Sequence, residues 1–233
     1  MKFKIHYIIL LAIAFGAQSC KKDNYEAPSS TLSGRISYNG EEIGLEYNQV
    51  PLELYQPGFG KSGAITSTFD QDGSYSTLLF NGEYKLIIPN GQGPFRWQER
   101  AGGGRDTLNV SVTGNQTLDL EVTPYFMIHN ATFATSGNNV NATCRIDQII
   151  TGADAREIES VTLFINKTQF VSRADNIANN EIGAAAITDP ANVSMSVAVP
   201  AITPTQNYVF ARIGLKISGV EDMIFSPLQK IQL

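Results

Sequence analysis

Hydrophobic and polar residues alternate along most of the chain in short runs, and strong helical periodicity is absent. Glycine, asparagine, aspartate and proline interrupt these runs every few residues. Successive side chains of a strand point to opposite faces, so each run places an apolar stripe on one face and a polar stripe on the other. The pattern predicts an all-β protein built from antiparallel strands.

The runs fall into two groups, which predict two consecutive antiparallel β-sandwiches. The first group lies in residues 31–123 and comprises "LSGRISYNG", "QVPLELYQ", "GEYKLIIP", "DTLNVSVTG" and "QTLDLEVTP". The second lies in residues 125–233 and includes "VTLFINK", "VSMSVAVP", "YVFARIGLKISG" and a last edge strand in "MIFSPLQKIQL". Only Pro124 separates the groups, so we expect a stiff junction between the domains.

Two stretches leave their local structure open. Residues 173–192, "RADNIANNEIGAAAITDPAN", have no clear period and fit either a short helix with loops or a functional surface loop. In "FDQDGSY", Asp70, Asp72 and Gly73 stand in the order that opens a calcium loop, but the twelfth position holds Asn81 where such a loop needs an acid. We therefore interpret this stretch as a hairpin with Asp72-Gly73 in its turn, and we assign no metal ligands.

The N-terminus has the three parts of a secretory signal over residues 1–19: a basic start, an apolar core and small residues before Cys20. The apolar core is too short for a membrane span, which needs roughly 20 residues. "AQSC" resembles a lipobox, which implies that Cys20 becomes the lipidated first residue of the mature protein. Residues 20–30 are polar and contain Pro and Ser, as expected of a flexible tether. An ordinary secretion signal is the alternative.

The few cysteines and histidines limit the chemistry of the mature chain. With Cys20 lipidated, Cys144 has no partner for an internal disulfide, and the alternation in "VNATCRI" places its thiol inward as an inert group. His129 is the only histidine outside the signal, which excludes a multi-histidine zinc site and restricts any triad to this residue. We expect His129 to be a strand residue with a satisfied hydrogen bond.

The charge pattern excludes a nucleic-acid partner. Removal of Lys2 and Lys4 with the signal lowers the 17 basic side chains to 15, against 22 acidic ones, and the only basic cluster is Lys21-Lys22. No pair of carboxylates stands out as a glycosidase pair. We assign no catalytic residue and no cofactor, and we predict that the protein is not an enzyme.

The first group of strands carries a resemblance to a known module. "LSGRISYNG", "TSTFDQDGSYS" and "LFNGEYKLIIP" resemble the carboxypeptidase-regulatory, transthyretin-like sandwich, which is usually a spacer or binding unit. The second group predicts an immunoglobulin- or fibronectin-III-like sandwich. The whole order, through "VTPYF" to "FSPLQKIQL", resembles uncharacterised two-domain lipoproteins of Bacteroidota. That resemblance implies an outer-membrane, cell-surface location and association with a starch-utilisation-type transporter that takes up glycans.

The long connection of residues 88–108, "IPNGQGPFRWQERAGGGRDTL", is the candidate binding site. It is rich in glycine and far longer than a hairpin needs. An aromatic ring can stack on a sugar while nearby charged groups bind its hydroxyls. The alternative is a structural role in which the tryptophan plugs the domain junction or caps the sandwich. The candidate residues are Phe95, Arg96, Trp97 and Glu99, with Tyr47, Tyr55 and Phe59 from other connections.

Together these observations favour a non-enzymatic surface lipoprotein that binds glycan as an accessory to uptake. Its expected partners are the membrane, through the lipid on Cys20, a glycan, and an outer-membrane transporter complex. The alternative is a structural or adhesive lipoprotein that contacts other proteins through its sheet edges and has no sugar site.

Overall fold

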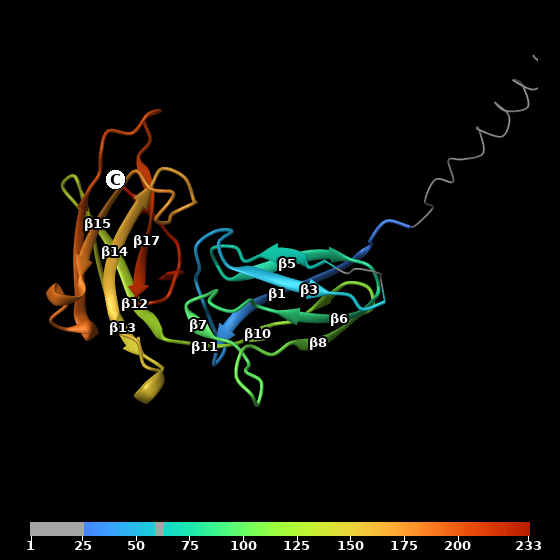
Figure 1. The fold of residues 1–233 in the computed structure, drawn as a ribbon. Coiled ribbons are helices and arrows are strands. Elements are labelled where there is room, and N and C mark those ends of the chain that lie inside the picture. Colours follow the sequence, from blue (N-terminus) through green and yellow to red (C-terminus); the bar gives the residue numbers. More distant parts are fainter. Residues whose placement is uncertain (1–25, 59–62) are drawn as a thin grey trace, which may run out of the picture.

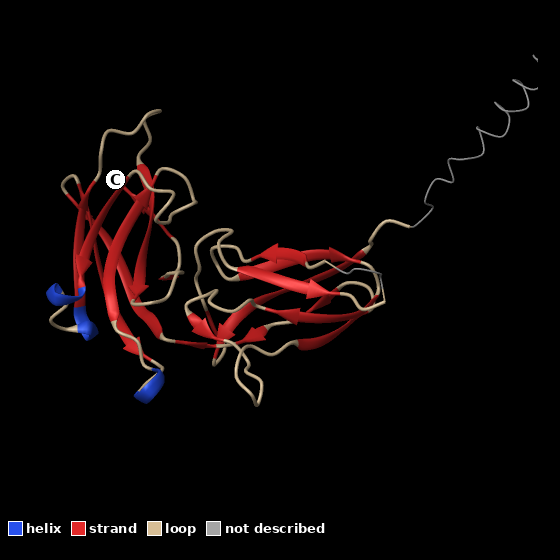
Figure 2. Ribbon diagram, in the orientation of Figure 1, coloured by secondary structure: helices blue, strands red, loops and turns tan. Residues whose placement is uncertain are grey.

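The computed structural model describes residues 26–58 and 63–233, so the signal, Cys20 and Phe59 lie outside the described residues. Two β-sandwich domains follow each other along the chain (Figures 1 and 2), as the alternation predicts. The helices of the described residues are single 3-10 turns, η1 (Gly152–Asp154), η2 (Ala184–Ala186) and η3 (Pro190–Asn192). None of these helices could cross a lipid bilayer.

The first domain consists of two facing sheets. One contains β1 (Ser30–Tyr38), β2 (Glu41–Glu42), β5 (Ser74–Leu79), β9 (Gln116–Thr117) and β10 (Leu120–Glu121). The other has the order β4-β3-β6-β8, with bounds β3 (Pro51–Tyr55), β4 (Ile65–Thr68), β6 (Gly82–Ile87) and β8 (Leu108–Val112). Antiparallel pairing dominates, but β1 pairs in parallel with both β9 and β10. Alternation along a strand does not specify the direction of its partner strand, so the sequence did not indicate the parallel pairing of β1.

The core of the first domain comes from the apolar stripes that the sequence analysis identified. Leu32 and Ile36 of β1 are fully buried, as are Leu52 and Leu54 of β3 on the facing sheet. Each such side chain contributes roughly 1.5 to 3 kcal/mol to folding when it leaves water. This burial is what holds the two sheets together.

Gly34 lies where Leu118, in the chain between β9 and β10, comes close to β1. Leu118 donates its N–H to the carbonyl oxygen of Ser33 at 2.8 Å, and its own carbonyl oxygen accepts from the Tyr75 hydroxyl at 2.7 Å. A Cβ atom on residue 34 would lie 2.0 Å from that carbonyl oxygen. Only glycine allows the two backbones to approach this closely.

The second domain also has two sheets. The smaller contains β12 (Phe126–Ser136), β13 (Asn139–Gln148) and β16 (Val193–Ala198). The larger contains β15 (Ala178–Gly183), β14 (Ile158–Asn166), β17 (Tyr208–Ile217), β18 (Ile224–Phe225) and β19 (Gln229–Gln232). Pro227 separates β18 from β19, which both pair with β17. The closing segment therefore forms two short strands rather than one.

Both open stretches fold differently from their expected structures. Residues 173–192 contain β15, which pairs antiparallel with β14, and the 3-10 turns η2 and η3; neither interpretation included the strand. The predicted hairpin at Asp72-Gly73 is also wrong, because β4 pairs with β3 whereas β5 pairs with β1. Asp70 and Ser74 still form a tight turn, in which Gly73 alone has a positive φ, of 76°. The turn carries the chain from one sheet to the other.

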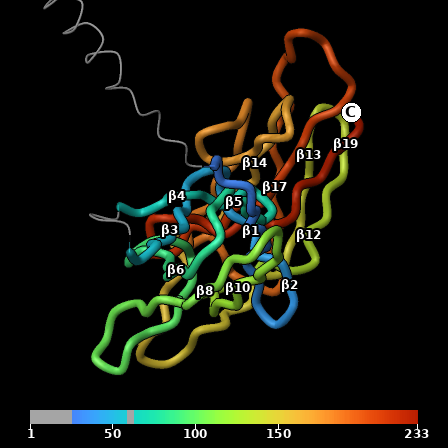
Figure 3. The backbone as a smooth tube through the Cα atoms, turned by 90° about the vertical axis from the view of Figure 1, so that its right-hand side faces the viewer, coloured from blue at the N-terminus to red at the C-terminus, as the bar shows by residue number. Residues whose placement is uncertain are grey.

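The two domains contact each other at the junction, where Pro124 led us to expect a stiff connection, and its stiffness stays a prediction. A short pair of strands, β7 (Phe95–Arg96) and β11 (Thr123–Pro124), ties the long connection to the segment that enters the second domain. One continuous cluster of buried hydrophobic residues extends through both domains. The strands of the second domain run crosswise to those of the first (Figures 1 and 3).

The close approach of Leu118 to Gly34 generates a stability prediction. Gly34→Ala forces its Cβ against the Leu118 backbone, and we expect it to lower the free energy of unfolding by about 3 kcal/mol or more. Chemical denaturation measures the loss. Gly183→Ala is the matched control, because Gly183 is also a strand glycine and has open space around its Cβ position. Equal stability of the two variants would contradict the close approach.

Candidate functional site

The connection of residues 88–108 is folded tightly against the domain junction. The side chain of Arg105 donates to four carbonyl oxygens at 2.8 to 3.2 Å, those of Ile88, Pro89, Gln92 and Phe95. An isolated β-bridge joins Glu99 to Arg105. These contacts hold the connection as a rigid unit despite its glycines.

Trp97 and Phe95 are buried inside this unit. The exposed fraction is 4% for Trp97 and 1% for Phe95. The indole N–H of Trp97 donates to the carbonyl oxygen of Asp106 at 2.8 Å, inside the same connection. Neither residue presents a free ring face, so the expected exposed stacking platform is not formed here. The geometry matches the structural alternative for Trp97.

Arg96 and Glu99 lie at the surface beside the buried rings. The Arg96 guanidinium contacts the Glu99 carboxylate at 2.7 Å and the Asp154 carboxylate of the second domain at 2.5 Å. Hydrogen bonds from Arg96 to Glu99 and then to Asp154 raise the pKa of Arg96. The pair with Asp154 links the domains, and whether Arg96 or Glu99 also contacts a ligand stays a prediction.

The other predicted aromatic residues lie in separate places. Tyr55 is half-buried in β3, where its hydroxyl donates to Glu53 at 2.6 Å, and this hydrogen bond raises the Tyr55 pKa. Phe59 lies outside the described residues. Tyr47 lines a different cavity, between the domains, so the structure brings neither Tyr47 nor Tyr55 together with Trp97.

We call this cavity between the domains the interdomain groove. Its lining includes Tyr47, Asp70, Gln71 and Asp72 of the first domain and Gln169 and Phe170 of the second. Its volume is about 570 Å³. The rings of Tyr47 and Phe170 lie 4.9 Å apart at an angle of 56°. They remain 40% and 38% exposed. The groove therefore holds the exposed aromatic pair that the sequence analysis sought near Trp97.

Cross-domain hydrogen bonds position the aromatic pair. The Gln71 side chain donates to the Gln169 carbonyl oxygen at 3.0 Å and accepts from the Val171 N–H at 3.0 Å. These two bonds hold the backbone on either side of Phe170. The Glu46 carboxylate, next to Tyr47, accepts from the Ala174 N–H at 3.2 Å. The connection that carries Phe170 is thus held against the first domain.

The turn that was predicted as a hairpin supplies acidic groups to the groove. Asp70 and Asp72 are both exposed there. Partial burial acts to raise the pKa of Asp72, but hydrogen bonds from the Ser74 hydroxyl and N–H, with the charge of Arg35, bring it below its usual value. Asp72 is therefore ionised at neutral pH and can accept hydrogen bonds. No trio of His, Cys, Asp or Glu within residues 26–58 and 63–233 is arranged to hold a metal ion.

A buried arginine forms the floor of the groove. Arg212 of β17 is 1% exposed and donates to the carbonyl oxygens of Ser226 at 3.0 Å, Leu45 at 2.9 Å and Gln71 at 2.9 Å. Its guanidinium also lies 4.5 Å from the ring centre of Phe225. Burial lowers the pKa of Arg212 to about 9, which leaves it charged at neutral pH. The two domains thus share one buried cation.

Sequence reasoning missed Arg212 and Phe170. Arg212 occupies a polar position in the alternation of β17, which predicts a solvent-facing side chain when one domain is considered alone. Phe170 follows β14 in a polar connection, where a single aromatic residue carries little signal. An arginine flanked by apolar residues on both sides in "VFARIGL" was the one available hint.

Cys144 and His129 both have structural roles. Cys144 is 3% exposed, and burial raises its pKa to about 11, so the thiol is inert as expected. His129 lies in β12, as expected, with its Nδ1 2.5 Å from Asp147 and its Nε2 2.9 Å from Glu41 of the first domain. The Asp147 hydrogen bond is the main cause of a raised pKa at His129. His129 thus contributes another polar link between the domains.

The fold and the interdomain groove define a two-domain β-sandwich protein with a concave surface at the junction of its domains. A family model described as the protein of unknown function DUF3823, N-terminal domain, matches residues 30–123. A second, described as the domain of unknown function DUF3823_C, matches residues 126–230. The chain belongs to the DUF3823 family.

Solved structures of related proteins agree with this assignment. A DUF3823 family protein from Parabacteroides merdae is 33% identical with a TM-score of 0.76, over 89% of this chain and 100% of its own. One from Bacteroides ovatus is 29% identical with a TM-score of 0.75, over 88% and 100%. A Bacteroides uniformis structure described as a "putative carbohydrate binding protein" shares the fold at 17% identity and a TM-score of 0.69, over 88% and 100%. No curated protein matched the chain.

Proposed function

We propose that this protein is a non-enzymatic, lipid-anchored surface protein that binds glycan in the interdomain groove. The Tyr47–Phe170 pair carries the proposal, because two exposed rings lie over a groove lined by carboxylate and amide groups. The C–H faces of a sugar ring pack on aromatic rings, and its hydroxyl groups donate to carboxylates such as those of Asp70 and Asp72. The description of the Bacteroides uniformis relative supports the same class of ligand.

The position of the groove suits capture outside the cell. Strand β1 begins at the end of the first domain that lies away from the second domain (Figure 1). Its nine residues span about 30 Å toward the junction. A lipid on Cys20 would therefore place the groove on the side of the molecule remote from the membrane. We propose that glycan held there is passed to an outer-membrane transporter.

The lipid anchor has its own test. If Cys20 is the acylated first residue, mass spectrometry of the protein purified from its native membrane detects an N-terminal peptide that begins at Cys20 and carries acyl chains. Cys20→Ala then leaves the membrane fraction. A native protein that begins elsewhere, or that carries no acyl chain, would refute the anchor while leaving the groove proposal standing.

Tyr47→Ala and Phe170→Ala test the groove. We expect the wild-type protein to be retarded by at least one polysaccharide in native gels, and each variant to bind it about tenfold more weakly because a stacking surface is lost. The melting temperature should change little, since both rings are about two-fifths exposed. Phe80→Ala is the matched control, because Phe80 is 41% exposed and follows β5 at the opposite end of the first domain.

The same experiment separates the alternative function. Retardation that is equal in the wild type, Tyr47→Ala and Phe170→Ala would exclude the groove as the glycan site. A wild-type protein that binds no polysaccharide of a broad panel, yet retains a protein partner through this surface, would favour the adhesive alternative. Loss of retardation in Phe80→Ala as well would show that the effect is not specific to the groove.

A further inference from the structure

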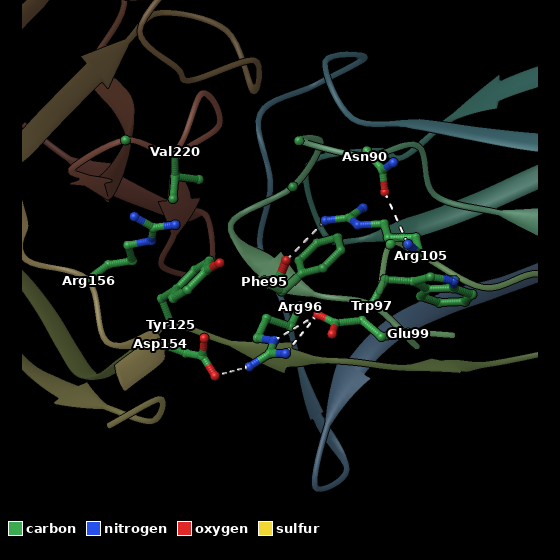
Figure 4. Close-up of a pocket in the computed structure, with 14 residues that line it drawn as sticks. Asn90, Phe95, Arg96, Trp97, Glu99, Arg105, Tyr125, Asp154, Arg156 and Val220 are labelled. Atoms are coloured by element: carbon green, nitrogen blue, oxygen red, sulfur yellow. Dashed lines mark hydrogen bonds and ion pairs between the residues drawn. The ribbon is translucent and has the colours of Figure 1, made fainter. Parts of the chain in front are cut away.

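A cavity separate from the interdomain groove lies at the junction. It is formed between the connection of residues 88–108 and the second domain. Its volume is about 410 Å³. Figure 4 shows guanidinium groups approaching it from both domains, Arg96 and Arg105 from the first and Arg156 from the second. We call it the arginine pocket.

Two of the three arginines are committed to the fold. Arg96 is paired with the carboxylates of Glu99 and Asp154. Arg105 donates to backbone carbonyl oxygens, which satisfy its N–H groups without neutralising its charge. Burial lowers the pKa of Arg105, as expected for a cation with neutral partners.

Arg156 is the arginine of the pocket whose guanidinium is available to a ligand. Within the described part of the chain its guanidinium makes neither an ion pair nor a hydrogen bond, and it is exposed at the rim of the pocket. The guanidinium lies 6.0 Å from the centre of the Tyr125 ring. Arg156 therefore offers a charged group with free donors in the planar arrangement that matches a carboxylate.

Tyr125 gives the pocket a fixed wall between the arginines. Its N–H donates to the Pro94 carbonyl oxygen at 3.2 Å, and its own carbonyl oxygen accepts from the N–H groups of Ile149 at 3.0 Å and Ile150 at 3.4 Å. The ring lies between Arg156 and the Phe95–Arg105 side of the pocket (Figure 4). A ring-shaped ligand can pack beside Tyr125 while its anionic group faces Arg156.

The charges that line the pocket suit a monoanion. Three guanidinium groups and the two carboxylates of Glu99 and Asp154 leave one positive charge. Asp222 also acts on Arg105, but it is buried behind the pocket wall and accepts from the Gly93 N–H at 2.6 Å. Its carboxylate thus faces the backbone and not the ligand space.

We propose that the arginine pocket binds a saccharide through a monoanionic group, either the carboxylate of a uronic acid or a sulfate ester, with Arg156 as the main contact. The choice of an anion rests on the pocket alone. The choice of a saccharide rests on the proposed function. The pocket and the interdomain groove are separate sites, which would together favour an acidic glycan.

Calorimetric titration tests the pocket with matched probes. Trigalacturonate and its methyl ester share one sugar backbone, and esterification removes the charge of each carboxylate while adding a methyl group. A sulfated κ-carrageenan tetrasaccharide represents the sulfate source. We expect one of the two acidic probes to bind, the ester to bind at least tenfold more weakly than trigalacturonate if the carboxylate is the ligand, and added salt to weaken binding. The stronger acidic probe identifies the source of the anion.

Arg156→Gln should weaken binding of the acidic probe at least tenfold, whereas Arg156→Lys should retain part of it. Arg173→Gln, another exposed arginine, is the matched control and should bind as the wild type does. Arg156 tests the pocket, whereas Tyr47 and Phe170 test the groove, so the two proposals can fail separately. The pocket proposal is overturned if neither acidic probe binds, or if Arg156→Gln binds like the wild type.

Discussion

The buried guanidinium of Arg212 is the interaction on which the arrangement of the two domains depends. Removing a charge from water costs several kcal/mol unless hydrogen bonds replace its hydration. Arg212 obtains those bonds from Ser226 of its own domain and from Leu45 and Gln71 of the other. If the domains moved apart, water would replace these two acceptors, so the cross-domain bonds of Arg212 favour the docked arrangement by the net energy of two charged hydrogen bonds.

We call the hydrogen bonds of Arg212 to both domains the clamp. The remaining contacts at the junction surround the clamp and shape both cavities. On one side, the side chain of Gln71 brackets Phe170 and places it beside Tyr47. On another side, the Asp222 carboxylate accepts a hydrogen bond from the Gly93 N–H, which attaches the long connection of residues 88–108 to the second domain. Here the loops of one domain are fixed by the other, and the concave surfaces exist only because both domains are present.

The sequence predicted elements well and relations between elements poorly. Alternation located most strands because an inward stripe must be apolar whatever it faces, and Cys144 and His129 behave as their positions indicated. Strand β15 was missed because Asn180 occupies a half-buried position in its alternation. The sequence left Trp97 open between a ligand contact and a structural plug, because nothing local shows that Arg105 folds the glycine-rich connection inward. The candidate groove draws on residues more than 100 positions apart, so no local pattern could assemble it.

The clamp can be tested by calorimetric unfolding of the protein beside its Arg212→Met variant, in which a side chain of similar length cannot donate. Shared solvation of Arg212 predicts that the wild type unfolds in one transition with equal calorimetric and van't Hoff enthalpies. It also predicts that the variant unfolds at a lower temperature and in two separate transitions, one for each domain. A variant that unfolds in a single transition at the wild-type temperature would contradict the clamp.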